Sequence, residues 1–328
     1  HLSEKQGVGS SILPLATMEL NKFFSNKELL KYLPEFIEIY NLRPIKNNKM
    51  GMGINHSFAV YALLKKLNIS HVIESGIAQG HSTWLIENSI PDIDLISVDL
   101  DLSNRLYISK NSNTNYVEGD IEDISFEDLD TNKTIVFFDD HTNVMHRLKF
   151  LHAWGIRYAI FEDNYPPGHG DSYSIRKIFS DYGQPITDMV PGYKYKNEFE
   201  KFKFLPKNLQ NRLTTANTTW PYFLTHYHHV QNKLRKPNLV DKVLFRKIVK
   251  NYYEIQPIYL YKNQKWGVSG WDGKYRALEP LFAEIKDSKF STEFEKFEKE
   301  SPDRMFNYNY ISFVELCLLY TSDAADES

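Results

Sequence analysis

The sequence predicts an α/β fold with a mostly parallel sheet, and two regularities along the chain support this prediction. Short apolar runs, rich in Val, Ile and Phe, have the length and composition of buried strands at residues 71–74, 95–99, 115–118, 134–138 and 158–161. Helical patterns lie before and between these runs, over residues 58–67, 82–89 and 144–154. Strands that alternate with helices form a parallel sheet covered on both faces. We therefore predict a Rossmann-like, doubly wound sheet with helices on both faces.

The remainder of the chain predicts additions to this core. Charged residues alternate with Leu, Phe and Ile at helical spacing over residues 19–40, which indicates one or two leading helices. A helix is expected from Ser172 to about Tyr182, and a late strand at residues 255–261. The stretch 186–250 is rich in Lys, Asn, Tyr and His and lacks strand periodicity, as an inserted cap does. The predicted divisions are a helical segment at 1–49, the core domain at 50–185, a cap at 186–250 and a return to the core at 251–316.

The C-terminal residues 317–328 resemble the in-frame translation of a transposase sequencing adapter, so we expect the natural protein to end near Leu316. The single cysteine, Cys317, lies in this tail, and the rest of the chain therefore offers no disulfide, thiolate metal site or cysteine nucleophile. The 39 basic residues are balanced by 42 acidic ones, three of them in the tail, which gives no electrostatic case for nucleic acid. No apolar run reaches the roughly 18 residues of a membrane span. We expect a cytoplasmic protein, and the sequence carries no signal for its oligomeric state.

A glycine-containing segment, Glu74-Ser75-Gly76-Ile77-Ala78-Gln79-Gly80, joins the first strand to its helix. A loop at this place lets a ligand approach the backbone at the carboxyl edge of the sheet. A dinucleotide loop needs G-x-G-x-x-G, where the helix N-terminus holds a pyrophosphate, whereas this one has only G-x-x-x-G. Taken alone, the two glycines are as well explained by a structural turn.

Acids after the next two strands add context to this loop. Asp99 ends the second strand, 25 residues after Glu74, where its carboxylate can accept both hydroxyls of a ribose. Asp101 is an alternative for the same role, and Asp120 follows the third strand. The simpler interpretation makes Asp99 a helix cap and Asp120 a turn residue.

The pattern E-x-G-x-x-x-G resembles motif I of class I methyltransferases, which bind S-adenosylmethionine (SAM), a cofactor without phosphate. The resemblance implies that this loop lies along the methionine part of SAM and that an acid after the third strand faces the adenine amino group. The residues implied in cofactor binding are Glu74, Gly76, Gly80, Asp99 and Asp120.

Polar residues also close the fourth and fifth strands, in Phe137-Phe138-Asp139-Asp140-His141 and Ile160-Phe161-Glu162-Asp163-Asn164. These ends are neighbours at the carboxyl edge of a doubly wound sheet. Carboxylate and amide oxygens that converge there suit Mg²⁺ or a similar ion, which would lower the pKa of a bound hydroxyl. Without a metal, His141 is the best candidate for a general base. The simpler interpretation is that these acids cap loops or helix N-termini.

The F-D-D-H and E-D-N elements resemble the D-G-D-H and D-N elements of cephalosporin-hydroxylase-like and sugar O-methyltransferases, and more distantly those of catechol-type O-methyltransferases. The resemblance covers about residues 50–182. It implies Asp140, Asp163 and Asn164 as metal ligands, and His141 with Asp140 as catalytic residues beside a small-molecule hydroxylated acceptor. Two positions depart from the family pattern: Phe138 stands where the first aspartate is common, and no lysine matches the catalytic lysine of the catechol type.

Two other functions are compatible with parts of this pattern, and one further segment suggests a metal site. A nicotinamide oxidoreductase is disfavoured by the incomplete glycine pattern and by the absence of a Tyr-x-x-x-Lys pair. A non-catalytic SAM-binding domain would keep the loop without the chemistry of the strand ends. The segment His226-Tyr227-His228-His229 invites a zinc interpretation, but with no cysteine nearby a solvated or cap-interface segment is favoured.

Overall fold

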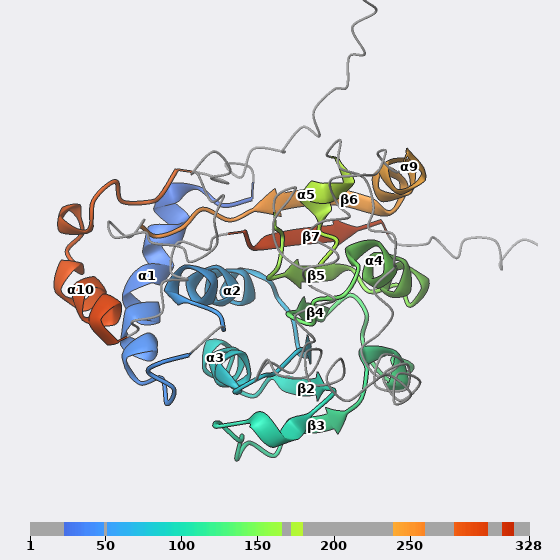
Figure 1. Ribbon diagram of the computed structural model, residues 1–328, viewed down its shortest axis with the longest axis horizontal. Coiled ribbons are helices and arrows are strands. Elements are labelled where there is room, and N and C mark those ends of the chain that lie inside the picture. Colours follow the sequence, from blue (N-terminus) through green and yellow to red (C-terminus); the bar gives the residue numbers. More distant parts are fainter. Residues whose placement is uncertain are drawn as a thin grey trace, which may run out of the picture.

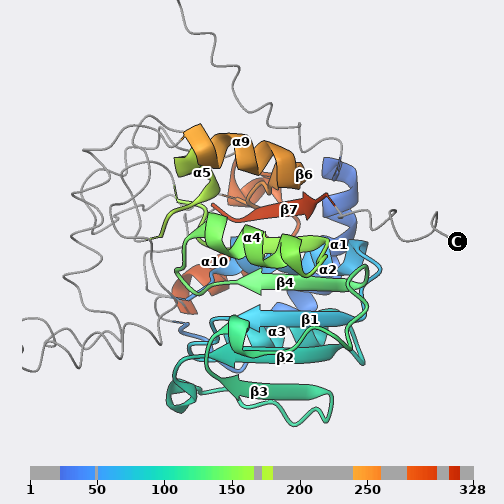
Figure 2. The same cartoon turned by 90° about the vertical axis from the view of Figure 1, so that its right-hand side faces the viewer.

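The protein, described here as a computed structural model, is built on one seven-stranded sheet (Figures 1 and 2). The structure describes residues 23–48, 51–165, 172–179, 239–259, 279–300 and 310–317. The sheet has the strand order β3-β2-β1-β4-β5-β7-β6. Its strands are β1 (His71–Ser75), β2 (Asp94–Asp99), β3 (Thr114–Glu118), β4 (Thr134–Phe138), β5 (Tyr158–Phe161), β6 (Val249–Glu254) and β7 (Ser312–Leu316).

The first five strands are parallel and in close register, so their carboxyl ends meet at one edge. Val72 of β1, for example, lies opposite Leu95 of β2 on one side and Ile135 of β4 on the other. The chain runs outward from β1 through β2 to β3 and then returns to β4 on the other side of β1. Ligands of open α/β sheets bind outside the carboxyl ends at such a switch point. The loops after β1 and β4 are therefore the expected place for a site.

The sheet is completed by two strands from the C-terminal part of the chain. β7 lies between β5 and β6 and is antiparallel to both. Because of β7, the strand order of this sheet differs from the order 3-2-1-4-5-6 of six-stranded dinucleotide-binding folds. The sequence did not predict β7, and it placed the late strand at 255–261. In the structure the strand is β6, which ends at Glu254. Residues 255–259 follow it without strand structure, and their apolar pattern reflects burial, since Ile255 and Ile258 are both buried.

Helices cover both faces of the sheet (Figure 1). Alternate strand residues explain the two layers: Val72 and Phe137 belong to one core cluster, and Ile73 and Phe138 to the other. The first layer contains α1 (Asn26–Asn41), α2 (Ile54–Lys66), α3 (His81–Ser89) and α10 (Ser291–Glu300), and the second contains α4 (Val144–Ala153), α5 (Ile175–Ile178) and α9 (Leu239–Ile248). The predicted Rossmann-like, doubly wound and mostly parallel α/β sheet is confirmed.

The first turn of α2 differs from the sequence prediction. The sequence predicts a helix over residues 58–67, but the helix begins at Ile54, so Asn55, His56 and Ser57 lie within its first turn. These three polar side chains are buried because each has a distant partner. Asn55 bonds the backbone of residues 258 and 259, His56 bonds Glu162, and Ser57 bonds His81.

Other predicted boundaries fall partly outside the described residues. Of the helix expected over residues 172–182, the structure describes residues 172–179 and shows one short turn, α5. Of the proposed cap at 186–250, it describes only residues 239–250, which form α9 and the start of β6 and pack on the sheet. The segment 226–229 lies outside the described part.

Only the first residue of the adapter-like tail lies within the described part. Cys317 donates its backbone N–H to the carbonyl of Ile248, and residues 318–328 lie outside the described residues. None of the helices in the described residues is long and apolar enough to cross a membrane.

Candidate active site

The loop after β1 takes its shape from two glycines in the left-handed region. Gly76 has φ +96°, and a Cβ there would lie 2.2 Å from the carbonyl oxygen of Asp139. Gly80, with φ +91°, is the N-cap of α3, and a Cβ there would lie 2.7 Å from the carbonyl oxygen of Tyr107. Both positions therefore require glycine because backbone approaches closely. At Gly76 the close neighbour is the turn after β4, so the loops after β1 and β4 are packed against each other.

Asp99 lies against this loop. Its Oδ2 accepts hydrogen bonds from the backbone N–H of Ile77 at 2.7 Å and of Ala78 at 3.0 Å. Asp101 instead turns to its own segment and accepts from the N–H of Ser103 at 2.9 Å. The structure thus places Asp99, and not Asp101, at the glycine loop.

Glu74 lies behind the loop and is completely buried. Its Oε2 accepts hydrogen bonds from the hydroxyls of Thr83 at 2.7 Å and Ser97 at 2.6 Å. Burial raises the pKa of the Glu74 carboxyl to about 7. These contacts tie β1 to β2 and α3, so Glu74 holds the loop from within.

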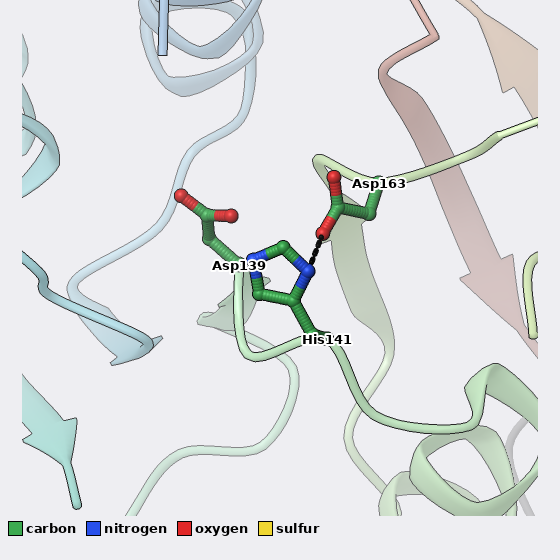
Figure 3. Close-up of side chains that lie close together, drawn as sticks. All are labelled: Asp139, His141 and Asp163. Carbon is green, nitrogen blue, oxygen red and sulfur yellow. Dashed lines mark ion pairs between the residues drawn. The ribbon is translucent and has the colours of Figure 1, made fainter. Parts of the chain in front are cut away.

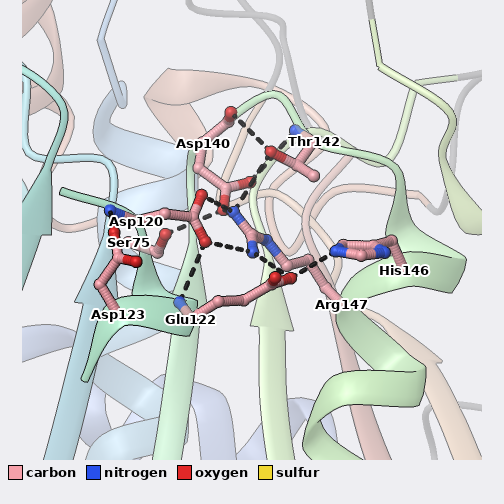
Figure 4. A network of polar contacts seen from close by, with 8 residues as sticks. All are labelled: Ser75, Asp120, Glu122, Asp123, Asp140, Thr142, His146 and Arg147. Carbon is pink, nitrogen blue, oxygen red and sulfur yellow. Dashed lines mark hydrogen bonds and ion pairs between the residues drawn. The ribbon is translucent and has the colours of Figure 1, made fainter. Parts of the chain in front are cut away.

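Asp120, the acid after β3, is bound by an arginine of α4 (Figure 4). Its two carboxylate oxygens accept from Nη1 and Nη2 of Arg147 at 2.8 and 2.7 Å. Burial opposes ionisation of Asp120, but the hydrogen bonds and charge of Arg147 outweigh it and lower the pKa of the carboxyl. Asp120 also accepts from the N–H of Glu122, as an acid that caps a short helix does.

Asp140, one of the predicted metal ligands, belongs to the same polar network. Its Oδ2 accepts from Nε of Arg147 at 2.9 Å and from the hydroxyl of Ser75 at 2.8 Å. Its Oδ1 accepts from the N–H of Thr142 at 3.1 Å. Both oxygens of Asp140 are thus held by protein donors, and its role as a metal ligand stays a prediction.

Asp139, His141 and Asp163 form a cluster at the ends of β4 and β5 (Figure 3). One ligand atom from each lies within 4.8 Å of the others. His141 Nδ1 is 3.0 Å from Oδ2 of Asp163, and His141 has φ +53°, an uncommon conformation for a residue with a side chain. Two carboxylates and an imidazole at this spacing are able to bind a divalent ion.

Asn164, the third predicted ligand, is bonded to residues of β6 and α5. Its Nδ2 donates to the hydroxyl of Tyr252 at 2.7 Å, and its Oδ1 accepts from the N–H of Arg176 at 3.2 Å. Of the predicted set, only Asp163 thus joins the cluster. The other two members of the cluster, Asp139 and His141, were not in the predicted ligand set.

Glu162 and His56 extend this cluster into the protein interior. Glu162 is buried, and its Oε1 lies 2.6 Å from Nδ1 of His56 on α2. Burial lowers the pKa of His56 to about 3, so its imidazole is neutral at neutral pH. Burial, and then the negative charges of Asp139 and Asp163, raise the pKa of Glu162 well above its ordinary value. Burial and Asp163 do the same to the pKa of Asp139.

A small cavity adjoins the cluster between the ends of β4 and β5. Its walls include His141, Asp163, Phe138 and Phe161, whose two rings are stacked with centroids 5.0 Å apart, and Tyr173. Sequence reasoning assigned no role to Asp139, Glu162, His56 or Arg147. The acids stood in the quoted motifs, but nothing in the sequence brings His56 or Arg147 to them.

Comparison of the sequence with models of protein families and with curated proteins gives no match. Among solved structures, a CmcI structure with Mg and SAM is 25% identical over 34% of this chain and 52% of that one, with a TM-score of 0.29. The plantazolicin methyltransferase BpumL in complex with S-adenosylhomocysteine (SAH) is 10% identical over 91% of this chain and 94% of that one, with a TM-score of 0.30. An O-methyltransferase from Bacillus cereus in complex with SAH is 12% identical over 57% and 83%, with a TM-score of 0.26.

The chain spans 51% of the length of one further CmcI structure and 62% of another. Because these TM-scores lie between 0.26 and 0.30, the assignment of the fold depends on the strand order and on the two helical layers described above.

Proposed function

We propose that this protein is a SAM-dependent methyltransferase that methylates a hydroxyl group of a small molecule such as a sugar. The observation that carries the proposal is the packing of two loops at the switch point. The loop Gly76–Gly80 and the turn that bears Asp139 and His141 approach so closely that Gly76 admits no side chain. A cofactor laid along the first loop would thus lie beside the polar cluster of the second.

The shape of the first loop favours SAM over a dinucleotide. It lacks the third glycine of a pyrophosphate cradle, and β7 departs from the dinucleotide-binding strand order. SAM needs contacts to its ribose and its methionine part and none to a phosphate. Asp99 is our candidate for the ribose hydroxyls. For Asp120, whose oxygens are bound by Arg147, we propose a place in the wall of the adenine pocket.

Methyl transfer breaks the bond between the methyl carbon and the sulfonium sulfur, forms a bond from that carbon to the acceptor oxygen, and releases SAH. The acceptor hydroxyl also loses its proton, and the protein must hold the oxygen in line with the sulfur–carbon bond. We propose that the acceptor hydroxyl lies beside His141 and Asp163, at the ends of β4 and β5.

Two roles of the cluster are compatible with this step. In the first, Asp139, His141 and Asp163 hold a divalent ion such as Mg²⁺, which when bound would lower the pKa of the acceptor hydroxyl. The raised pKa of Asp139 and of the neighbouring Glu162 supports this role, because buried like charges favour a cation between them. In the second, His141 is oriented by Asp163 and takes the proton itself as a general base.

Calorimetry with SAM, SAH and NAD tests the cofactor. We expect micromolar affinity for SAM and SAH and none for NAD. Asp99→Ala should weaken SAM binding by roughly 1–3 kcal/mol, the range for lost hydrogen bonds to a charged group. Preference for NAD would overturn the proposal, and an unchanged affinity of the variant would move the ribose contact away from Asp99.

Manganese binding distinguishes the two roles of the cluster. At a concentration of Mn²⁺ about 100 times its dissociation constant, the ion should stabilise the folded protein by about 2.7 kcal/mol. Asp139→Asn should lose this effect, whereas Asp101→Asn, an acid outside the cluster, should keep it.

If Mn²⁺ stabilises Asp139→Asn as much as the native protein, the ion binds elsewhere. If methyl transfer is then insensitive to a chelator and falls by about 10²–10⁴-fold in His141→Ala, the general-base role is the correct one. Tight SAM binding without turnover of any hydroxylated acceptor would favour a non-catalytic SAM-binding domain.

A further inference from the structure

Arg147 is a buried cation at the edge of the sheet that carries the site. The side chain of Arg147 is 1% exposed. It donates from Nη1 and Nη2 to Asp120, and from Nε at 2.9 Å to Asp140. A weaker contact of 3.3 Å joins Nη1 to Glu122. One planar cation thus binds two carboxylates at once, which its fork of donors allows.

The two carboxylates come from strands that are not neighbours. Asp120 follows β3 and Asp140 follows β4, and the sheet order places β2 and β1 between them. Ser75, the last residue of β1, also donates its hydroxyl to Asp140 at 2.8 Å. The network therefore connects the ends of three strands around the glycine loop (Figure 4).

Asp140 stands between two members of the cluster that we propose binds the ion. Asp139 precedes it and His141 follows it, and His141 has the left-handed conformation with φ +53°. Such a backbone conformation persists only when its surroundings hold it. Arg147 and Ser75 hold one oxygen of Asp140, and the N–H of Thr142 holds the other. The direction of Asp140 fixes the turn, and the turn fixes the directions of Asp139 and His141.

We propose that Arg147 is a positioning residue that sets the geometry of both halves of the site. Through Asp140 it orients the turn that presents Asp139 and His141 to the ion, and through Asp120 it holds the loop that forms the adenine wall. This inference rests on the proposed function. Arg147 itself touches neither ligand, so its effect must pass through its two carboxylate partners.

The test compares equilibrium affinities for Mn²⁺ and for SAH in four proteins. These are the native protein, Arg147→Lys, Asp120→Asn and the control Arg157→Lys. Lysine keeps the charge of Arg147 but lacks the fork that binds two carboxylates. Arg157 donates two hydrogen bonds to Glu315 at 3.1 and 2.7 Å and lies at the start of β5, at the edge of the sheet opposite the site. Calorimetry measures SAH, electron paramagnetic resonance of free Mn²⁺ measures the metal, and circular dichroism checks the fold.

We expect Arg147→Lys to weaken Mn²⁺ binding by about 10–100-fold, the usual effect of removing a partner that orients metal ligands. It should weaken SAH by about tenfold, and Arg157→Lys should change neither affinity. Asp120→Asn is the sharper variant, because Asp120 lies outside the proposed ligand group and yet should lower Mn²⁺ affinity through Arg147. It also preserves the test if Arg147→Lys does not fold.

Unchanged Mn²⁺ affinity in the folded variants would overturn the positioning role, as would a loss of thermal stability alone. A loss of SAH affinity without a loss of Mn²⁺ affinity would overturn the claim that one residue serves both halves. If the native protein binds neither Mn²⁺ nor SAH, the proposed function fails together with this inference. Native binding with unaffected variants overturns the inference alone.

Discussion

Two groups of acidic residues lie at the same edge of the sheet, and they differ in what surrounds them. Asp120 and Asp140 bind the guanidinium of Arg147. Asp139, Glu162 and Asp163 lie near one another, with a neutral histidine, His56, against Glu162. The pKa of Asp120 is lowered by its cation, whereas those of Asp139 and Glu162 are raised by burial and by neighbouring carboxylates, among them Asp163 in both cases.

This difference indicates which acids are able to bind a cation or a proton. A buried carboxylate that is bound by an arginine has its charge compensated, and it serves the architecture. Buried carboxylates that face one another hold charge that only protons or an added cation can compensate. Asp139 and Asp140 are adjacent in the sequence and belong to opposite groups, so position in a motif alone does not assign such roles.

The largest expected effect comes from removing the cation of the first group. Arg147→Met should lower the free energy of unfolding by about 3–5 kcal/mol, because it leaves Asp120 and Asp140 buried without their partner. Urea denaturation measures this. The more exposed pair Arg157–Glu315 provides the control, and Arg157→Met should cost no more than about 1 kcal/mol. If the two variants lose the same free energy of unfolding, burial of Arg147 does not make its ion pairs more important for stability than those of Arg157.

A third acid, Glu74, sharpens the comparison because it is buried against hydroxyl groups with neither a guanidinium nor a second carboxylate bonded to it. Its pKa is raised to about 7 from an ordinary value near 4.5. An acid whose pKa is raised on folding destabilises the fold as pH rises from the unfolded value to the folded one. Stability should therefore fall between about pH 4.5 and pH 7, by as much as about 3 kcal/mol from this group.

Glu74→Gln removes the titrating group and keeps the shape of the side chain. The stability of the variant should not show this part of the decrease with pH. The free energy of unfolding of the variant, relative to that of the native protein, should therefore be higher at pH 8 than at pH 4. Urea denaturation at both pH values measures it. A pH dependence identical to that of the native protein would show that hydroxyl hydrogen bonds suffice to keep Glu74 ionised.

The smallest expected effect concerns the contact between the glycine loop and the turn that carries Asp139. Gly76 and Gly155 both have positive φ, +96° and +70°, but a Cβ at Gly155 would meet only Thr131, at 4.0 Å. Gly155→Ala should therefore lower stability only through the strain of a positive φ in a residue with a side chain. Gly76→Ala should cost about 1–3 kcal/mol more, the usual range for overpacking, because the Asp139 carbonyl must move. Thermal unfolding compares the two, and equal losses would mean that the turn yields freely.

Much of the fold could be predicted because its parallel strands follow one another in sequence order, and the central ones, β1, β4 and β5, consist mostly of buried residues. Phe137 and Phe138 face opposite layers, and both layers demand apolar side chains. β7 (Ser312–Leu316) was not predicted, because its partners β5 and β6 lie far from it along the chain, outside its local pattern. The pattern of an antiparallel strand inserted far along the chain gives no local signal.

The site could be predicted only to the level of strand ends. The motifs brought attention to the right segments, and Asp163 and His141 do lie together. Which of Asp139 and Asp140 faces His141 depends on Arg147, and the direction of Asn164 depends on Tyr252, a residue of β6. Both partners are distant in the sequence or on another element, so the local pattern contains no information about them.

The position of β7 also governs the order in which the sheet is able to assemble. Tyr158 of β5 lies opposite Glu315 of β7, and β6 pairs with β7 rather than with β5. During synthesis both β5 and β6 leave the ribosome before the strand that joins them, so each keeps an unpaired edge until the chain has reached residue 316. Unpaired edges recruit other chains, and long-range pairing is slow. β7 is thus the strand that completes the sheet. We expect a nascent chain to be most prone to aggregation just before β7 has been synthesised.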